Sequence, residues 1–153
     1  MLRQTLGRLE GLVTPERTWI ITNAEQMDAV RGICPDLPAD NVVAEPVGRD
    51  TAPAVALSAV LVAEAAGDAP FVMLPSDHVI KDDEAFRKDL SKALEAVSEE
   101  DRIATVGIVP TFPATGYGYI RAGTGESDGA WDPVEAFVEK PDLKTAEGYL
   151  AQG

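Results

Sequence analysis

Short apolar runs alternate with helix-forming segments along most of the chain, and this alternation restricts the fold more than any other feature. The runs that indicate strands are Trp19–Thr22, Asn41–Glu45, Phe71–Pro75 and Ile103–Val109. Strands that alternate with helices favour right-handed crossovers and a parallel sheet that helices cover on both faces. The sequence therefore predicts an α/β, Rossmann-like domain with a mostly parallel sheet.

Helical patterns fill the intervals between these runs. Helices are expected over residues 2–12, 23–33, 51–66, from 82 or 83 onward, and from 142 to 150. Asn23 is a candidate N-cap with Gln26 at the capping-box position, and Gly67 is a typical helix stop. The helix over 51–66 carries almost only Ala, Val and Leu, so we expect it to pack on several sides.

The pattern changes after Val109. Residues 116–121 and 134–139 each have the length of a strand, and a loop rich in Gly and Asp joins them. Two consecutive strands joined in this way favour antiparallel pairing. We therefore expect an antiparallel strand pair added to the parallel sheet.

Charge and cysteine content exclude several classes of function. The net charge of −13 disfavours nucleic acids and anionic membranes as partners. The single cysteine, Cys34, excludes an intrachain disulfide and a cysteine zinc site. No run reaches membrane-spanning length, and the first residues lack the apolar core of a signal peptide. We expect one cytoplasmic domain without nucleic-acid or membrane partners.

Polar residues follow three of the expected strands. Residues 45–51 follow the second strand, Asp77 and His78 follow the third, and Glu139 and Lys140 end the last. Ligands of open α/β sheets bind beyond the carboxyl ends of the strands. The convergence of these polar ends predicts a small-molecule site.

The segment Glu45-Pro-Val-Gly-Arg-Asp-Thr-Ala-Pro53 joins an expected strand to a helix N-terminus. Gly48 allows close backbone approach, and Arg49 presents a planar fork of N–H donors. A helix N-terminus also attracts anions. The alternative is an ordinary turn with Thr51 as N-cap and Pro53 in the first helical turn. Taken alone, the segment leaves both interpretations open.

Asp77 is a candidate magnesium ligand. Magnesium prefers one or two carboxylates together with phosphate oxygens and water. The alternative is that Asp77 caps a turn or pairs with a nearby base. His78 is the single histidine, and the sequence favours a packed or supporting histidine over a general base. No serine or cysteine nucleophile arrangement supports a hydrolase.

Two later segments also have the character of ligand contacts. Glu139 can accept hydrogen bonds from sugar hydroxyls, and Lys140 can neutralise a phosphate as a point charge. Both could instead be solvated charges at a strand end. In residues 115–119 two glycines flank a tyrosine, which brings backbone and a flat ring close to a ligand, or simply bends a strand.

Four motifs, taken in order, resemble the sugar-phosphate nucleotidyltransferases and, within them, the mannose-1-phosphate guanylyltransferases. They are Glu45–Pro53, Leu74–Ile80, Thr115–Ile120 and Val138–Pro141. The resemblance implies a fold of the nucleotide-diphospho-sugar transferase type. It also implies that GTP and mannose 1-phosphate react to give GDP-mannose and pyrophosphate, with Mg²⁺ as cofactor.

The resemblance assigns roles to individual residues. Nucleotide contacts fall on Glu45, Pro46, Gly48, Arg49, Asp50, Thr51 and Ala52, and sugar contacts fall on Gly116, Tyr117 and Glu139. Asp77 is implied as the magnesium ligand and Lys140 as a contact of the sugar phosphate, which makes both candidate catalytic residues. Homo-oligomer formation stays open.

The chain also departs from the family pattern. The family's N-terminal glycine-rich loop, with an Arg and a Lys that hold the triphosphate, has no counterpart, because Leu2-Arg-Gln-Thr-Leu6 resembles the helix after that loop. The first sheet strand is expected to be missing with it, and Asp50 stands where asparagine is common. We therefore expect residues 1–153 to be a partial catalytic domain with little or no transferase activity. The alternatives are a non-catalytic sugar-nucleotide-binding or regulatory module and an inactive fragment.

Overall fold

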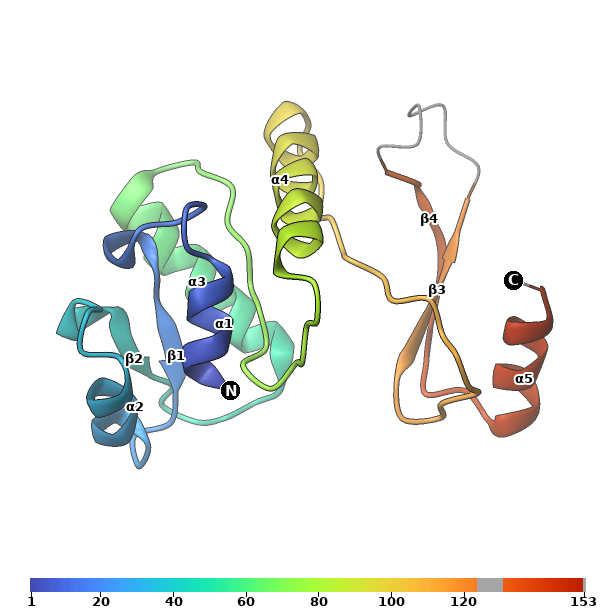
Figure 1. The fold of residues 1–153 in the computed structure, drawn as a ribbon, viewed down its shortest axis with the longest axis horizontal. Coiled ribbons are helices and arrows are strands. Elements are labelled where there is room, and N and C mark those ends of the chain that lie inside the picture. The colour runs from blue at the N-terminus through green and yellow to red at the C-terminus, as the bar shows by residue number, and fades with distance from the viewer. Residues whose placement is uncertain (124–130, 153) are drawn as a thin grey trace. The chain divides into compact units, whose positions relative to one another are not determined.

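The computed structural model describes residues 1–123 and 131–152 (Figure 1). The chain divides into two compact units, Met1–Asp101 and Arg102–Gly153. The described part has the α/β class predicted from the sequence, with one parallel and one antiparallel strand pair. No helix in the described ranges has both the length and the apolar content needed to cross a membrane.

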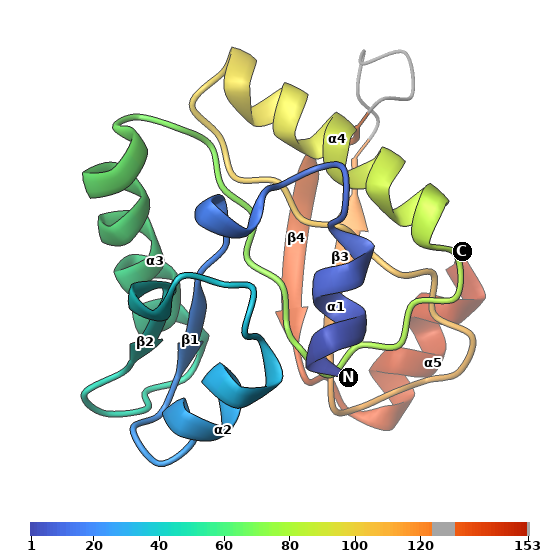
Figure 2. The same ribbon diagram turned by 60° about the vertical axis from the view of Figure 1, so that its left-hand side comes forward.

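The first unit contains a parallel strand pair with helices around it. Its elements are α1 (Leu2–Arg8), β1 (Ile20–Thr22), α2 (Met27–Ile33), β2 (Val42–Ala44), α3 (Thr51–Ala66) and α4 (Asp83–Glu99), with 3₁₀ turns at Pro15–Arg17 and Ala39–Asn41. Ile20 of β1 lies opposite Val42 of β2, and the two strands run side by side in Figure 2. This pair confirms the parallel pairing of the first two predicted strands.

Two of the four predicted parallel strands do not form. Residues 71–75 and 103–109 have no ladder partner within the described residues. Their apolar side chains are accordingly open to solvent, with Met73 40% and Ile103 95% exposed. A strand is held by the backbone hydrogen bonds of its neighbour, and an apolar composition does not provide that neighbour. The predicted sheet is therefore represented by β1 and β2 alone.

Helix ends with a strong local signal lie where the sequence predicts them. Asp82 caps α4, because its Oδ1 accepts a hydrogen bond of 2.9 Å from the Ala85 N–H. The α3 helix ends before Gly67, whose φ of +69° is a conformation that favours glycine. Both boundaries are confirmed.

Two helix boundaries differ from the prediction. The α1 helix ends at Arg8, four residues before the predicted end. The α2 helix begins at Met27, because the Asn23 Oδ1 accepts the Gln26 N–H at 2.9 Å and closes a turn ahead of the helix. Asparagine side chains compete with helices in this way. Asn23 therefore stabilises a turn, and its predicted role as the helix N-cap is wrong.

The α3 helix is less covered than predicted. Among its residues only Ala54 is buried, while Val55 and Val60 are exposed. A hollow of about 340 Å³, here called the α3 hollow, lies beside its C-terminal half and is lined by Ala59, Val62, Ala63, Gly67, Asp68, Ala69 and Phe71. The prediction that this helix packs on several sides is wrong for the described residues.

Asn41 ties the start of β2 to the chain ahead of β1. Its Nδ2 donates to the carbonyl of Thr18 at 2.9 Å and to that of Glu16 at 3.1 Å, and the residue is buried. We expect Asn41→Ala to lower the free energy of unfolding by about 1–3 kcal/mol, since both carbonyls lose their donor. Urea denaturation followed by Trp19 fluorescence measures the loss.

The control for this prediction is Asp40→Ala, at an exposed neighbour within the same 3₁₀ turn. A surface change of this kind is expected to stay within about 0.5 kcal/mol. Equal destabilisation by the two substitutions would show that the hydrogen bonds of Asn41 contribute nothing specific.

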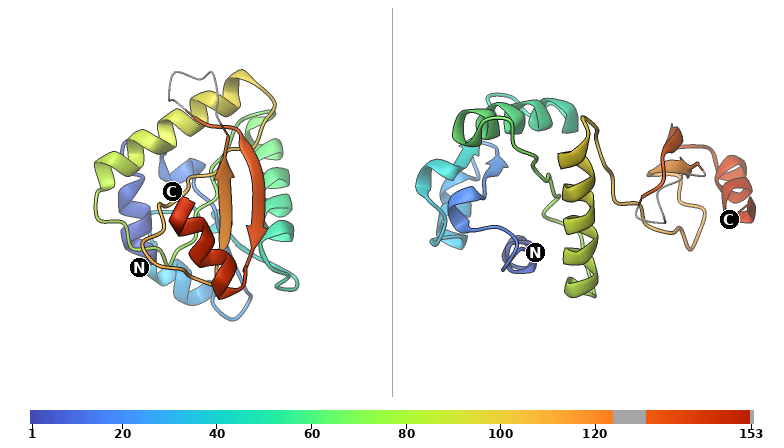
Figure 3. Two further views of the ribbon diagram at one scale, coloured as in Figure 1. Left: turned by 90° about the vertical axis from the view of Figure 1, so that its right-hand side faces the viewer. Right: turned by 90° about the horizontal axis from the view of Figure 1, so that it is seen from above.

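The second unit is an antiparallel pair with one helix packed on it. Strands β3 (Gly118–Ala122) and β4 (Val134–Glu139) pair as predicted, and α5 (Leu143–Gln152) follows them. Figure 3 shows α5 alongside the two strands, and the rings of Tyr119 and Tyr149 lie 5.4 Å apart. Ala146, one helical turn before Tyr149, is fully buried. This helix face therefore forms the core of the unit.

The start of α5 is capped as its sequence predicts. Asp142 Oδ1 accepts the Thr145 N–H at 2.8 Å. Hydrogen bonds from the Thr145 hydroxyl and N–H hold the pKa of Asp142 below its usual range. The cap is therefore strongest while this carboxyl is ionised.

Candidate functional site

The first motif lies in the loop between β2 and α3. The Glu45 N–H donates to the Thr22 carbonyl at 2.8 Å, which anchors the start of the loop to β1. Beyond it Pro46, Gly48 and Arg49 are exposed, and the Arg49 guanidinium has no hydrogen bond or ion pair with any described residue. The loop thus presents an unused planar cation next to a helix start.

The helix after this loop begins at Thr51, and its N-cap is Asp50. The alternative with Thr51 as N-cap is therefore wrong. Asp50 makes no side-chain capping hydrogen bond, so the first N–H groups of α3, including those of Thr51 and Ala52, have no side-chain acceptor there. Such free N–H groups can receive an anionic or polar ligand group.

Asp50 and Lys140 share an unusual backbone conformation. They are the two non-glycine residues with positive φ in the described ranges, at 55° and 44°. With ψ of −163°, Asp50 lies in a region occupied almost only by glycine. Aspartate adopts positive φ more often than most non-glycine residues, but this signal is weak, and sequence reasoning missed both positions. Strained positions concentrate at ligand-binding sites, and both of these fall within the predicted motifs.

We expect Asp50→Gly to raise the free energy of unfolding by about 1 kcal/mol. Relief of a strain of about 1–3 kcal/mol is partly offset by the greater backbone entropy that glycine loses on folding. The matched control is Asp50→Ala, which removes the carboxylate but keeps the β-carbon and the strain. Urea midpoints that shift equally in the two variants would show that the backbone at Asp50 is not strained.

Asp77 lies in the loop over residues 76–82 that precedes α4, and both Asp77 and His78 are exposed. The carboxylate of Asp77 has no hydrogen bond or ion pair with the part of the chain that the structure describes, so neither a turn cap nor a pairing with a base is observed. His78 is exposed, so the prediction that it is packed is wrong. Asp77 therefore offers a free carboxylate to the solvent, and its role as a magnesium ligand stays a prediction.

The donor set around Asp77 bears on the metal prediction. In residues 1–123 and 131–152 no group of three or more His, Cys, Asp or Glu side chains could hold a metal ion. One free carboxylate is nevertheless a donor that suits Mg²⁺ when nucleotide phosphates complete its coordination. The residues present fit a magnesium ion shared with a nucleotide, and they do not form a closed protein site.

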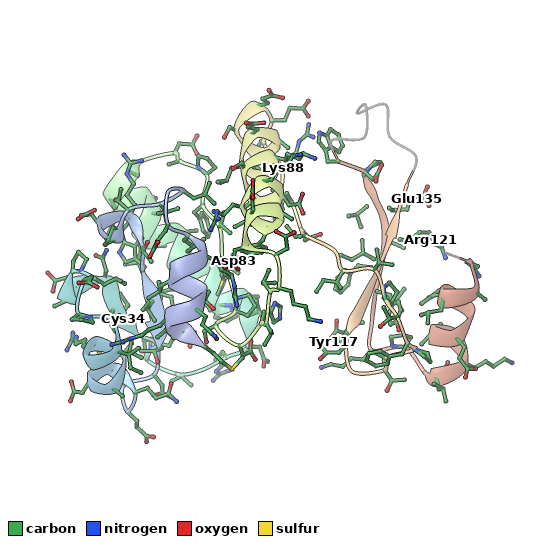
Figure 4. The ribbon with its side chains drawn as sticks, viewed as in Figure 1. Cys34, Asp83, Lys88, Tyr117, Arg121 and Glu135 are labelled. Atoms are coloured by element: carbon green, nitrogen blue, oxygen red, sulfur yellow. The ribbon has the colours of Figure 1, made fainter. Side chains whose placement is uncertain are left out.

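The other two motifs meet at one end of the β3–β4 pair. The Lys140 N–H donates to the Tyr117 carbonyl at 3.2 Å, and Glu139 lies opposite Gly118 in the ladder. Gly116 and the exposed Tyr117, labelled in Figure 4, immediately precede β3. The structure therefore brings the predicted sugar contacts and Lys140 together.

The side chains of Glu139 and Lys140 lie close together at this strand end, whereas successive side chains within a strand point to opposite faces. Lys140 Nζ lies 3.5 Å from Glu139 Oε1, and both side chains are exposed. The positive φ of Lys140 ends the alternation of a strand. An exposed ion pair adds little stability, so both groups remain available to a ligand.

The candidate residues fall into two groups, one in each unit. Residues 45–52 and Asp77 belong to the first unit, and residues 116–117 and 139–140 belong to the second. No hydrogen bond or ion pair between described residues joins Asp77 to residues 45–52. None of these residues lines the α3 hollow.

Comparison with known proteins decides the family. The Nucleotidyl transferase family model matches residues 1–153. The chain belongs to this family. It is 41% identical over 157 aligned residues to a mannose-1-phosphate guanylyltransferase of Klebsiella pneumoniae, with 100% of this chain and 33% of that protein covered.

The chain is also similar to a second curated protein and to a solved structure. The xanthan biosynthesis protein XanB of Xanthomonas campestris pv. campestris (strain B100) is 51% identical over 112 residues, which cover 73% of this chain and 23% of XanB. A solved structure from Thermus thermophilus, described as a mannose-1-phosphate geranyltransferase, superposes with a TM-score of 0.86 at 44% identity. The match covers 99% of this chain and 43% of the Thermus chain.

These findings confirm the resemblance that the four motifs indicate. The nucleotidyltransferase fold extends over the whole chain, and relatives of about 40% identity over its full length are mannose-1-phosphate guanylyltransferases. The chain spans about a third or less of the length of the curated relatives it matches.

Proposed function

We propose that this nucleotidyltransferase chain belongs to the machinery that makes GDP-mannose and pyrophosphate from GTP and mannose 1-phosphate. The observation that supports the proposal most is that charged side chains of the motifs take little part in the fold. Arg49 and Asp77 have no partner within the described residues, and the pair Glu139–Lys140 is exposed. Guanine and mannose are supported by the names of the relatives.

The reaction is an in-line transfer in which the protein positions charged groups. A phosphate oxygen of mannose 1-phosphate bonds to the α-phosphorus of GTP, the bond from that phosphorus to the bridging oxygen breaks, and pyrophosphate leaves. Positioning and electrostatic stabilisation supply most of the rate enhancement in such a step. Charged side chains at the motifs are therefore the residues expected to matter.

Each group of candidate residues receives a role in this proposal. Residues 45–52 hold the guanine and ribose, residues 116–117 with Glu139 hold the sugar, and Lys140 neutralises the phosphate of mannose 1-phosphate. Asp77 would hold Mg²⁺, which when bound supplies positive charge that offsets the charge on the phosphates. Cytoplasmic GTP is the donor, and neither nucleic acid nor membrane is a partner.

These residues include no glycine-rich loop with Arg and Lys to hold a triphosphate. We therefore expect the chain by itself to bind the product GDP-mannose without turning over GTP. This expectation also accommodates the second candidate function, a sugar-nucleotide-binding module that does not catalyse transfer.

A paired assay tests the proposal. The chain is incubated with GTP, mannose 1-phosphate and Mg²⁺ while pyrophosphate is measured, and equilibrium dialysis measures GDP-mannose binding. We expect background turnover with saturable binding, and weaker binding of UDP-glucose as the control ligand. Robust GDP-mannose formation would contradict the expected loss of activity, and absence of both binding and turnover would contradict the proposed site.

A further inference from the structure

Two buried polar side chains lie on one face of α1. Thr5 and Arg8 are only 7% and 6% exposed. Residues three apart in a helix share a face, and the Arg8 Nη1 donates to the Thr5 Oγ1 at 3.4 Å. Arginine is rarely buried unless it is paired, because desolvation of its charge is unfavourable. The partners of these two side chains therefore indicate what this face of α1 holds.

Thr5 and Arg8 contact the two ends of the loop that carries Asp77. At the first end, the Thr5 hydroxyl lies 3.4 Å from the carbonyl of Ser76, the residue before Asp77. At the second end, the Arg8 Nε lies 3.2 Å from the Asp83 Oδ1, at the first residue of α4. In Figure 4 Asp83 is labelled next to α1. One helix face thus anchors both ends of residues 76–82.

A second contact joins α4 to α1 one helical turn after Asp83. The Arg87 Nη1 donates to the main-chain carbonyl of Arg8 at 3.3 Å. Between its two ends the loop borders a hollow of about 340 Å³, here called the α1 hollow, which is lined by Gln4, Gly7, Arg8, Glu10, Val79, Ile80 and Asp83. The loop therefore passes directly over α1.

The loop contains a turn at residues 76–77 and forms no helix or strand. In the described part of the chain, no backbone N–H of residues 77–81 donates a hydrogen bond to another backbone group. A segment without internal hydrogen bonds takes its position from the contacts at its ends. The direction of the Asp77 carboxylate therefore depends on the contacts of Thr5 and Arg8.

We propose that Thr5 and Arg8 are positioning residues that fix the loop over 76–82 and so aim Asp77 at a metal-bound nucleotide. The anchoring is independent of any ligand, whereas the aim toward a nucleotide rests on the proposed function. Two measurements separate these parts.

The first measurement is limited proteolysis with an endoproteinase that cleaves after lysine. Lys81 lies in the loop and Lys92 lies within α4, so their cleavage rates report loop opening and helix unfolding separately. We expect Arg8→Met to accelerate cleavage after Lys81 roughly tenfold, as for loss of a hydrogen bond to a charged group. Cleavage after Lys92 is expected to change much less.

Two further variants keep this test decisive. Lys88→Met removes the same charge from an exposed position of α4, where Lys88 has no hydrogen bond or ion pair with a described residue, and it is expected to leave cleavage after Lys81 unchanged. Arg8→Lys keeps a cation near Asp83 and is expected to restore most of the protection. The anchoring is overturned if Arg8→Met increases the cleavage rates after Lys81 and after Lys92 by the same factor, or if it leaves the cleavage rate after Lys81 unchanged.

The second measurement is GDP-mannose binding with and without Mg²⁺. For Arg8→Met we expect the gain in GDP-mannose affinity that Mg²⁺ provides to fall roughly tenfold. This is the lower end of the loss in metal affinity that follows when a residue holding a metal ligand in place is removed. Affinity without Mg²⁺ is expected to stay as in the unaltered chain, which a merely structural role would not predict. An equal fall with and without Mg²⁺ would overturn the positioning role. If the unaltered chain binds no GDP-mannose, the proposed function fails, and the proteolysis still decides the anchoring.

Discussion

Asp77→Asn is expected to remove most of the Mg²⁺-dependent affinity of the chain for GDP-mannose. The carboxylate of Asp77 is exposed and has no partner among the described residues, so a metal-bound nucleotide is the ligand that would use its charge. The asparagine amide keeps the shape of the side chain but carries no negative charge, and Mg²⁺ prefers carboxylate oxygens as ligands. We expect the affinity measured with Mg²⁺ to fall at least roughly tenfold, and the affinity in a chelator to stay unchanged.

Isothermal titration calorimetry with Mg²⁺ or with a chelator measures this difference. The matched control is Asp89→Asn, which removes one carboxylate from an exposed position of α4 and is expected to leave both affinities unchanged. Because Asp77 takes no part in the fold, its replacement should not lower the melting temperature. If Asp77→Asn binds GDP-mannose with the unaltered Mg²⁺ dependence, Asp77 is not the metal ligand.

Ala146→Asp is expected to unfold the second unit while the first unit stays folded. Ala146 is fully buried on the face of α5 that contacts β3 through the ring pair Tyr119–Tyr149. An unpaired carboxylate at this point costs several kcal/mol. Two strands without a covering helix are at best marginally stable, so the unit has little stability to lose.

The two tryptophans of the chain let each unit be followed separately. Trp19 lies in the first unit, and Trp131 lies in the second, where the Arg102 guanidinium is 4.2 Å from its ring centre. The first variant combines Ala146→Asp with Trp19→Phe, so that Trp131 alone fluoresces. We expect Trp131 in this variant to show, even without urea, the fluorescence that it has in the unfolded chain. With Trp131 replaced instead, the Trp19 transition is expected to keep its midpoint.

The control for this prediction is Ala151→Asp, the same substitution at an exposed position of α5. We expect it to leave the Trp131 transition in place. If Ala146→Asp shifts the unfolding midpoints of Trp19 and Trp131 by the same amount, the two units unfold together. The prediction that each unit unfolds on its own is then contradicted.

The structural features that the sequence predicts well depend on residues close together in the chain. The cap at Asp82 and the helix stop at Gly67 each involve contacts within a few residues. The pairing of β3 with β4 joins neighbouring strands. Such features follow from side-chain chemistry and local backbone preference. Most polar side chains of the motifs are exposed, and their binding of a ligand stays a prediction.

The structural features that the sequence does not predict depend on distant contacts or on the backbone state of one residue. Residues 71–75 and 103–109 have strand composition, but no described residue supplies a partner strand. Thr5 and Arg8 carry an ordinary helix pattern, and only their contacts across the fold show that they are buried. The positive φ of Asp50 is not predicted, because aspartate adopts this conformation only occasionally.

The proposed function assigns sugar-nucleotide binding to each of the four motifs, and an NMR titration of the ¹⁵N-labelled chain with GDP-mannose and Mg²⁺ tests this assignment most directly. We predict saturable shifts with a single dissociation constant at residues 45–52, 76–78, 116–118 and 139–140. The amide signals of residues around the α3 hollow should not shift. Shifts confined to one motif, different dissociation constants for the two units, or no saturable shifts at all would contradict the assignment.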